Sequence, residues 1–178
     1  MNNDTMLKMQ KMRLPALVQN YREQLEHPEL YDSMTFAERV ALMVDAEYDT
    51  RENNKIKRLL KQSSVPESTA HMAGIEYLAD RHLNKELMEQ LQTNDCIRKG
   101  LNVMLIGATG SGKTYIASAL TTNACRHGYR ARYFRDNEFF SDLDAARVQG
   151  LYDQEIARLG SIPLLILDDF LLVPTTGD

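Results

Sequence analysis

The chain has 178 residues, of which 43% are hydrophobic and 26% charged, and its formal net charge is −4 at pH 7. This composition is ordinary for a globular protein, and the acidic balance excludes a uniformly basic nucleic-acid coat while allowing a local basic patch. No apolar run approaches the roughly 20 residues that span a bilayer, and the first residues lack the apolar core of a signal peptide. The two cysteines make no disulfide framework. We therefore expect a cytoplasmic protein without a membrane segment.

The region from about residue 5 to residue 62 is predicted to be all-helical. Pro15 suits the start of a second helix, because proline is favoured in the first helical turn. Thr35 and Glu38 have the spacing of a capping box, which opens a further helix. Apolar side chains recur along one side of that helix: Phe36, Val40, Val44 and Tyr48. We interpret residues 1–64 as a small all-helical N-terminal domain.

A basic stretch ends this helical region. It is opposed only by Glu52 and comprises Arg51, Lys55, Lys57, Arg58 and Lys61. One interpretation is a solvated helix face. The other is contact with the backbone of double-stranded DNA, where each phosphate contact adds salt-dependent affinity. The candidate DNA-binding residues are Lys55, Lys57, Arg58 and Lys61.

The polar segment 63–69, interrupted by Pro66, is the best candidate for a domain boundary. We therefore assign residues 65–178 to a second domain. Helical periodicity resumes over residues 70–95, and Gly100 ends a last short turn. The segment then leads into four apolar residues, Val103–Ile106, which are typical of a short buried strand.

A glycine-rich loop follows that strand. Residues 107–114, GATGSGKT, match G-x-x-x-x-G-K-[ST] at every fixed position, and apolar residues at helical spacing come next. A strand before the motif and a helix after it form the context that a phosphate-binding loop requires. A glycine-rich turn that binds nothing would not need the Gly-Lys-Thr run.

Each residue type in the loop has a chemical reason. Gly107, Gly110 and Gly112 are predicted to permit positive φ and so turn successive N–H groups inward, toward a polyphosphate. The following helix adds the positive end of its dipole. Lys113 would reach the β- and γ-phosphates, and the Thr114 hydroxyl would bind Mg²⁺. The predicted nucleotide-binding residues are Gly107, Ala108, Thr109, Gly110, Ser111, Gly112, Lys113, Thr114 and Tyr115.

The rest of the chain alternates between helix and strand. The helix after the loop should end near Gly128, and a strand is predicted over 131–135, a helix from residue 136 or 137 to Gly150, and a short helix over 151–160. The continuous apolar run 164–167 suits a strand buried on both faces of a parallel sheet. The order βαβαβ implies a parallel sheet with right-handed crossovers.

Two carboxylates end the last strand. Asp168 is placed to hold Mg²⁺, usually through water, at the carboxyl end of a parallel strand. Asp169 is a candidate catalytic residue that would polarise the attacking water, with Lys113 as the other catalytic candidate. On its own this pattern would favour a solvated acidic turn, and the phosphate loop upstream decides for the metal site.

With these residues placed, the chain resembles the IstB-like transposition helper ATPases and, more loosely, the DnaC-type helicase loaders, both of the AAA+ class. The resemblance is carried by MRLP at residues 12–15, the helix over 36–47, GATGSGKTYIASAL, HGYRARYF and LLILDDF. It implies an α/β fold with the parallel sheet of a P-loop NTPase of AAA+ type. It also implies Mg²⁺-dependent ATP hydrolysis, a homo-oligomer on double-stranded DNA, and assistance to the transposase of the same element. Leu171 departs from the glycine of the family pattern.

The resemblance further implies a later strand with a polar sensor residue, another strand and an arginine finger. The sequence stops at Asp178, so we expect a core that is cut off after the acidic (Walker B) strand and that hydrolyses little ATP alone. A helicase loader remains an alternative. A small-molecule phosphotransferase ranks lower, because the arginines cluster around a helix end and a strand rather than in a lid: Arg126, Arg130, Arg132 and Arg135. A nucleotide-free binding module is the third hypothesis.

Overall fold

The computed structural model describes residues 2–77 and 82–170. The chain divides into two compact units, Met1–Lys55 and Ile56–Asp178. The division falls inside helix α3 (Phe36–Ser63), whereas the sequence pattern places the boundary between residues 64 and 65. Neither proline nor glycine interrupts α3, and its last turns belong to the second unit, where Leu59 packs with Cys125 and Ala131.

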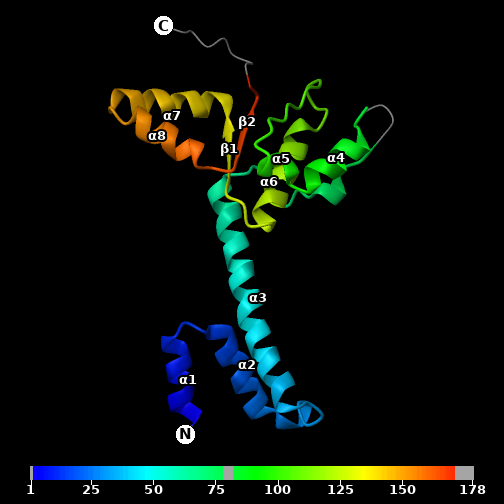
Figure 1. The fold of residues 1–178 in the computed structure, drawn as a ribbon, viewed down its shortest axis with the longest axis vertical. Helices are drawn as coiled ribbons and strands as arrows, with labels where there is room; N and C mark the ends of the chain where they lie inside the picture. The colour runs from blue at the N-terminus through cyan, green and yellow to red at the C-terminus, as the bar shows by residue number, and fades with distance from the viewer. Residues whose placement is uncertain (1, 78–81, 171–178) are drawn as a thin grey trace. The chain divides into compact units, whose positions relative to one another are not determined.

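The first unit is helical, as predicted. It contains α1 (Asn2–Lys11), α2 (Pro15–Glu26), a 3-10 turn, η1 (Pro28–Leu30), and the first part of α3 (Figure 1). Pro15 is the first residue of α2, so that prediction is confirmed. The capping box is also confirmed. The Glu38 carboxylate accepts a hydrogen bond from the Thr35 N–H at 2.7 Å, and the Thr35 hydroxyl oxygen accepts one from the Glu38 N–H at 3.3 Å.

Helix α2 is capped by a residue from another helix. Leu14, which precedes α2, provides no side-chain cap. Instead, the buried carboxylate of Glu47 on α3 accepts hydrogen bonds from the N–H groups of Ala16 at 2.9 Å and Leu17 at 3.2 Å. Arg51 donates to the other oxygen of Glu47 at 2.8 Å. Glu47 thereby satisfies two N–H groups that have no acceptor within α2 and ties α2 to α3.

The second unit holds a small sheet and its covering helices. After the end of α3 its elements are η2 (Met72–Gly74), α4 (Lys85–Gln92), α5 (Asp95–Arg98), α6 (Lys113–Arg126), β1 (Ala131–Arg135), α7 (Asp136–Val148), α8 (Tyr152–Gly160) and β2 (Leu164–Asp168). The elements predicted from residue 113 onward are confirmed, including the end of α6 before Gly128, whose φ is +83°.

The helix predicted over residues 70–95 is only partly correct. Helix begins at Lys85, and residues 70–77 are irregular apart from η2, while residues 78–81 lie outside the described part of the chain. Ala70, Met72 and Ile75 pack in one cluster with Ile116 and Ala119 of α6. The Thr122 hydroxyl of α6 donates to the Ala70 carbonyl at 2.5 Å. The apolar spacing of this segment therefore reflects packing onto α6 and not a helix of its own.

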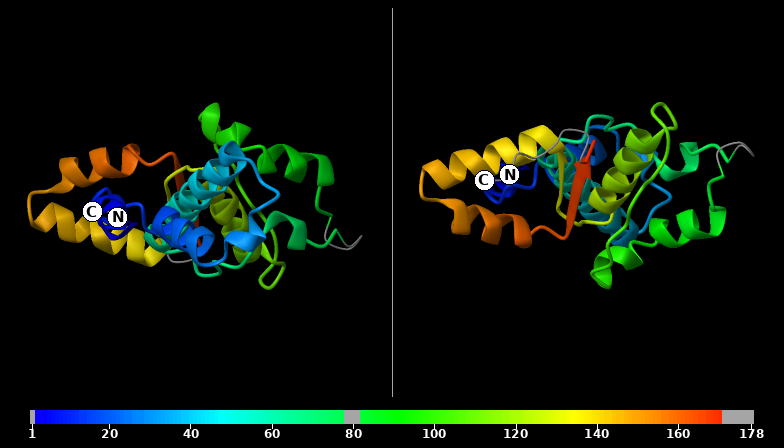
Figure 2. Two further views of the ribbon diagram at one scale, coloured as in Figure 1. Left: turned by 90° about the horizontal axis from the view of Figure 1, so that it is seen from below. Right: turned by 90° about the horizontal axis from the view of Figure 1, so that it is seen from above.

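The two strands pair in parallel, with Ala131 opposite Leu164 and Arg135 opposite Asp168. Successive residues of β1 face opposite sides of the sheet. On one side Ala131 packs with Cys125 of α6, and on the other Phe134 contacts Phe139 of α7, edge to face, with ring centroids 5.4 Å apart. The sheet therefore lies between α6 and the α7–α8 pair (Figures 1 and 2). This three-layer arrangement agrees with the predicted α/β class.

The strand predicted at Val103–Ile106 is wrong: residues 101–107, all of them described, have no regular secondary structure. In the described part of the chain, β2 pairs with β1 alone, and residues 103–106 have no strand to pair with. A strand needs a neighbour for its N–H and C=O groups. Only Leu105 packs against the core, whereas Met104 and Ile106 are 79% and 87% exposed.

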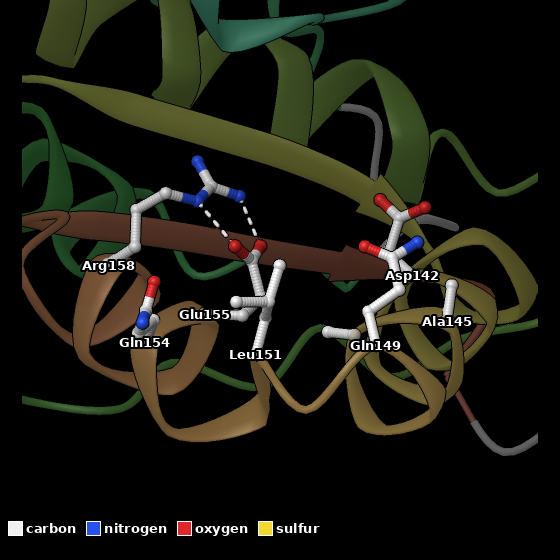
Figure 3. Close-up of a pocket in the computed structure, with 8 residues that line it drawn as sticks. Asp142, Ala145, Gln149, Leu151, Gln154, Glu155 and Arg158 are labelled. Atoms are coloured by element: carbon white, nitrogen blue, oxygen red, sulfur yellow. Dashed lines mark hydrogen bonds and ion pairs between the residues drawn. The ribbon is translucent and has the colours of Figure 1, made fainter.

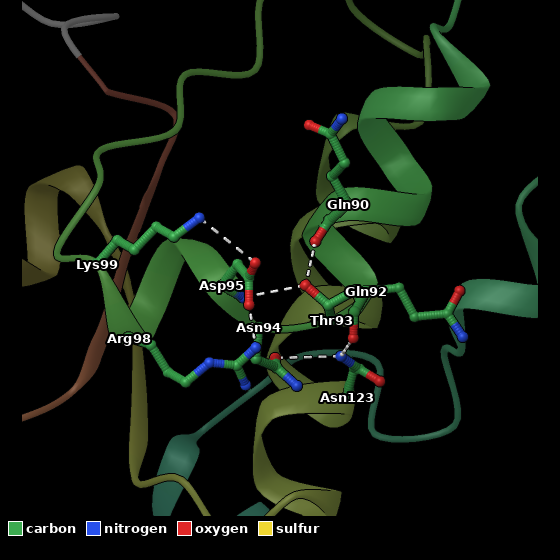
Figure 4. A network of polar contacts seen from close by, with 8 residues as sticks. All are labelled: Gln90, Gln92, Thr93, Asn94, Asp95, Arg98, Lys99 and Asn123. Atoms are coloured by element: carbon green, nitrogen blue, oxygen red, sulfur yellow. Dashed lines mark hydrogen bonds and ion pairs between the residues drawn. The ribbon is translucent and has the colours of Figure 1, made fainter.

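A polar network holds the short helices α4 and α5 against α6 (Figure 4). The Asn123 side chain of α6 donates to the Gln92 carbonyl at 2.9 Å and to the Asn94 side-chain oxygen at 3.1 Å. Asn94 is buried and has a φ of +61° between the two helices. The turn that precedes the phosphate-loop segment is thus fixed to the helix that follows it. Within the described residues, no helix is long and apolar enough to cross a membrane.

Candidate functional site

The loop between residues 107 and 114 has the predicted backbone at two of its three glycines. Gly110 and Gly112 have φ of +78° and +87°. The prediction of a positive φ at Gly107 is wrong, and this glycine is needed for space. A Cβ atom there would lie 2.8 Å from the Ser111 hydroxyl oxygen. The loop is therefore tightly folded at its start and left-handed at two later positions, as an anion-binding turn requires.

The loop ends at the N-terminus of α6. Gly112 precedes the helix and provides no side-chain cap. By helix geometry, the first N–H groups of α6 have no acceptor within the helix and lie at the positive end of its dipole. Tyr115 is expected to contribute through its N–H alone. Its hydroxyl lies against Gly74, where a Cβ atom would be 2.4 Å away, so the ring belongs to the packing around η2.

Lys113 lies across the loop. Its ammonium donates to the carbonyls of Gly107 at 2.8 Å and Ala108 at 2.9 Å. It is the one cationic side chain within the sequence 107–114. The lysine therefore folds back on the segment whose N–H groups the motif assigns to phosphate.

The acidic strand meets the phosphate loop through Thr114 and Asp168. The Thr114 hydroxyl donates to Asp168 Oδ2 at 2.9 Å, although the two residues are 54 positions apart. The Tyr133 hydroxyl donates to the same oxygen, and the Asp169 N–H donates to Asp168 Oδ1 at 3.0 Å. A hydroxyl and a carboxylate in contact are hard oxygen ligands of the kind that Mg²⁺ prefers. The donor set thus fits the predicted metal.

The charge state of Asp168 follows from these contacts. Burial raises the pKa of this carboxyl, but hydrogen bonds from Tyr133, Thr114 and the Asp169 N–H, with the nearby charge of Lys113, outweigh burial and lower it. Burial raises the pKa of Tyr133, and its hydrogen bond to Asp168 raises it further. Asp168 is therefore ionised near neutral pH, and Tyr133 is a neutral donor.

Asp169 takes a different position from its neighbour. It follows β2 with a φ of +59°, in the left-handed region, and its side chain is exposed. Within the described residues no hydrogen bond joins its carboxylate to the phosphate loop. The structure therefore brings Lys113, Thr114 and Asp168 together and leaves Asp169 beside them, facing solvent.

Similarity to a known family covers nearly the whole chain. The model of the family described as IstB-like ATP binding protein matches residues 7–176. The chain belongs to this family.

Two relatives illustrate the similarity. A Pseudomonas fluorescens protein, "Insertion sequence IS1162 putative ATP-binding protein", is 32% identical over 96% of this chain and 73% of its own length. A Sinorhizobium fredii protein, "Putative insertion sequence ATP-binding protein y4uH", is 29% identical over 100% and 71%. The IstB-like chain is thus similar over nearly its whole length to proteins that are named for insertion sequences.

The basic stretch of the IstB-like chain separates into two groups. Arg51 donates to Glu47 and, at 2.7 Å, to the Arg13 carbonyl, so it serves the packing of the first unit. Lys55 pairs with Glu52 at 3.4 Å. The remaining three are exposed and form no ion pair with another described residue: Lys57, Arg58 and Lys61. Three of the four predicted DNA contacts are therefore exposed on α3 without an ion pair to a described residue, whereas Lys55 is paired and Arg51 is engaged in the first unit.

One cavity of the second unit is separate from the predicted phosphate site. A cavity of about 440 Å³ lies between α7 and α8, and Asp142, Gln149, Leu151 and Arg158 are among the residues that line it (Figure 3). Its main charged groups pair with one another, because Arg158 donates to both oxygens of Glu155. None of the predicted nucleotide or metal residues lines this cavity.

Tyr133 was not predicted from the sequence. Its hydroxyl reaches Asp168 because β1 and β2 are neighbours, with Tyr133 opposite Ile166 and Arg135 opposite Asp168. A tyrosine within the strand ARYFR gives no sign of this contact until the register of the two strands is known.

Proposed function

We propose that this chain is the ATP-binding and ATP-hydrolysing part of a DNA-transposition helper. The observation that carries the proposal is the hydrogen bond between Thr114 and Asp168. It joins the end of a phosphate-loop motif to the end of the acidic strand. A glycine-rich turn without a ligand would have no reason to meet a carboxylate 54 residues away.

Each residue of the site has a role in this proposal. The loop N–H groups and the start of α6 would bind the phosphates, and Lys113 would leave the loop carbonyls to face them. Thr114 and Asp168 would hold Mg²⁺, which when bound neutralises charge on the β- and γ-phosphates. Asp169, exposed beside them, would polarise the attacking water.

DNA and protein partners complete the proposal. The relatives are named as insertion-sequence proteins, which supports a role in transposition. The accessible cations Lys57, Arg58 and Lys61, with Lys55, support contact with the backbone of double-stranded DNA. We further propose that several copies assemble on DNA when ATP is bound and assist the transposase of the same element.

The two competing hypotheses find less support. A phosphotransferase needs mobile arginines over its acceptor. Here Arg130 donates to the Ser161 carbonyl at 2.7 Å, and Arg132 donates to the Gln62 carbonyl at 3.1 Å and to the Ser64 hydroxyl at 2.7 Å. Those arginines serve the fold. An inert binding module would not need the Thr114–Asp168 contact.

Self-association tests the proposal as a whole. Light scattering of the chain is measured with ATP and Mg²⁺, with double-stranded DNA, and with both together. We expect the largest assemblies when ATP with Mg²⁺ and DNA are present together. When EDTA removes Mg²⁺, the size should not increase above that of the chain with DNA alone. A phosphotransferase would ignore DNA, and an inert module would ignore ATP, so either pattern would contradict the proposal.

A further inference from the structure

The hydroxyl of Tyr133 meets the half-buried carboxylate of Asp168 in the second unit. Tyr133 is 5% exposed and sits in the middle of β1. Ala131, two residues earlier, contacts α6, and alternate residues of a strand share a face. The Tyr133 side chain therefore lies on the α6 side of the sheet, and Thr114 is in the first turn of that helix. From there its hydroxyl donates to Asp168 Oδ2.

Two hydroxyls thus share one carboxylate oxygen. Thr114 and Tyr133 both donate to Asp168 Oδ2, while the Asp169 N–H occupies Oδ1. A carboxylate oxygen has two lone pairs, so these donors together fix the rotation of the carboxyl plane. The hydrogen bond to Asp168 in turn orients the Thr114 hydroxyl. Because the O–H group points at Asp168, the lone pairs of the Thr114 oxygen point away from it.

We propose that Tyr133 is a positioning residue for the Mg²⁺–nucleotide complex. Its hydroxyl holds the Asp168 carboxylate in the orientation that aligns both Asp168 and Thr114 toward the metal. This inference rests on the proposed function, because it gives Tyr133 a part in the same site. Groups that orient metal ligands commonly change metal affinity by about 10- to 100-fold when they are removed.

The alternative is that the hydrogen bond merely satisfies a buried tyrosine. The two explanations differ in what the hydroxyl affects. A structural hydroxyl would change the stability of the fold and the binding of nucleotide with or without metal. A positioning hydroxyl would change the dependence on Mg²⁺ and leave metal-free binding of the nucleotide as it was.

The experiment compares the parent chain with Tyr133→Phe, which removes one oxygen and keeps the ring. Binding of a fluorescent ATP analogue is measured in EDTA and then across a Mg²⁺ titration, and thermal unfolding is recorded without either ligand. Tyr152→Phe is the matched control, because Tyr152 begins α8 and its ring lies against Arg147 of α7, outside the site. Lys113→Ala is included to test nucleotide binding itself.

We expect Tyr133→Phe to bind the analogue in EDTA like the parent and to need about tenfold more Mg²⁺ for half-maximal enhancement. The Tyr152→Phe control should match the parent throughout. A parental Mg²⁺ midpoint in Tyr133→Phe would overturn the inference and leave the proposed function standing. So would a variant that fails to fold, or that loses affinity equally in EDTA and Mg²⁺. If the parent binds no nucleotide, or binds it as Lys113→Ala does, the proposed function fails.

Discussion

At the scale of single residues, Asp168 and Asp169 are neighbours with opposite surroundings. Asp168 is held by three donors, and Asp169 has a left-handed backbone and an exposed side chain. The sequence could predict a carboxylate pair at the end of a strand. It could not predict that only the first carboxylate meets the phosphate loop, because that depends on the direction in which the chain leaves the sheet.

This difference predicts separate effects of two substitutions. Asp169→Asn should spare ATP binding and slow hydrolysis by about a hundredfold, since it keeps the shape and removes the charge that polarises water. The measurement is steady-state phosphate release with ATP, Mg²⁺ and DNA, in a protein that also carries the expected sensor strand and arginine finger. Unchanged release would remove Asp169 from the catalytic site.

Asp168→Asn should act earlier, on binding. It removes the charge that faces Mg²⁺ and replaces one carboxylate oxygen by an NH2 group, so that one oxygen is left for the three donors Thr114, Tyr133 and the Asp169 N–H. We expect the Mg²⁺-dependent gain in ATP affinity to fall at least about tenfold, with binding in EDTA unchanged. Isothermal titration of both proteins with ATP, in EDTA and in Mg²⁺, measures this. A parental gain in Asp168→Asn would exclude Asp168 as a metal ligand.

At the scale of elements, local signals were the reliable ones. The capping box at Thr35 and Glu38, the helix start at Pro15 and the helix end at Gly128 each depend on neighbouring residues, and each is present. The strand predicted at residues 103–106 depends on a partner strand, and it is absent among the described residues. The cap of α2 by Glu47 could not be predicted from local sequence either, because Glu47 lies about 30 residues after the N–H groups that it accepts from.

Glu47 therefore provides a test at this scale. Glu47→Gln should lower the free energy of unfolding of the first unit by about 1–3 kcal/mol, since it weakens charged hydrogen bonds to two N–H groups and to Arg51. Urea unfolding followed by circular dichroism measures it. Glu52→Gln is the matched control on the same helix. Its exposed pair with Lys55 should matter by less than about 1 kcal/mol. Equal effects of the two substitutions would refute the capping role.

The same residue predicts a pH dependence. Burial raises the pKa of Glu47, but hydrogen bonds from Arg51 and from the N–H groups of Leu17 and Ala16 bring it below the ordinary value of 4.5. A group with a depressed pKa stabilises the fold above its unfolded value and loses that contribution as the pH falls. The difference in unfolding free energy between the parent and Glu47→Gln should thus be constant above about pH 5 and shrink below pH 4.5. A difference that grows on acidification would contradict this assignment.

At the scale of the whole molecule, the family and the parallel sheet could be predicted, because the phosphate loop and the acidic strand follow one another in an order that can be recognised in the sequence. The two-unit division could not, since α3 runs through it without a break. Contact with DNA remains a prediction. It depends on the exposure of the cations on α3, which the structure provides, and on a partner that a single chain does not contain.

Charge reversal tests the DNA proposal. Changing Lys55, Lys57 and Lys61 together to Glu should weaken binding to any double-stranded DNA and flatten the plot of log affinity against log salt by roughly one unit per lost contact. Reversal at Lys8, Lys11 and Lys85 changes net charge equally and serves as the control. ATP affinity should stay at the parental value in both. A parental salt slope in the first variant would identify this stretch as a solvated helix face.

We assign residues 107–114 to the phosphates of ATP, and Lys113→Ala is the test of this assignment. Removing the one cation of the loop should weaken the binding of a fluorescent ATP analogue with Mg²⁺ by at least about tenfold, since a charge-assisted hydrogen bond contributes about 1.5–3 kcal/mol. Lys99→Ala, whose partner is Asp95, is the control and should bind like the parent. Equal affinity of Lys113→Ala and the parent would contradict the assignment of the phosphate loop.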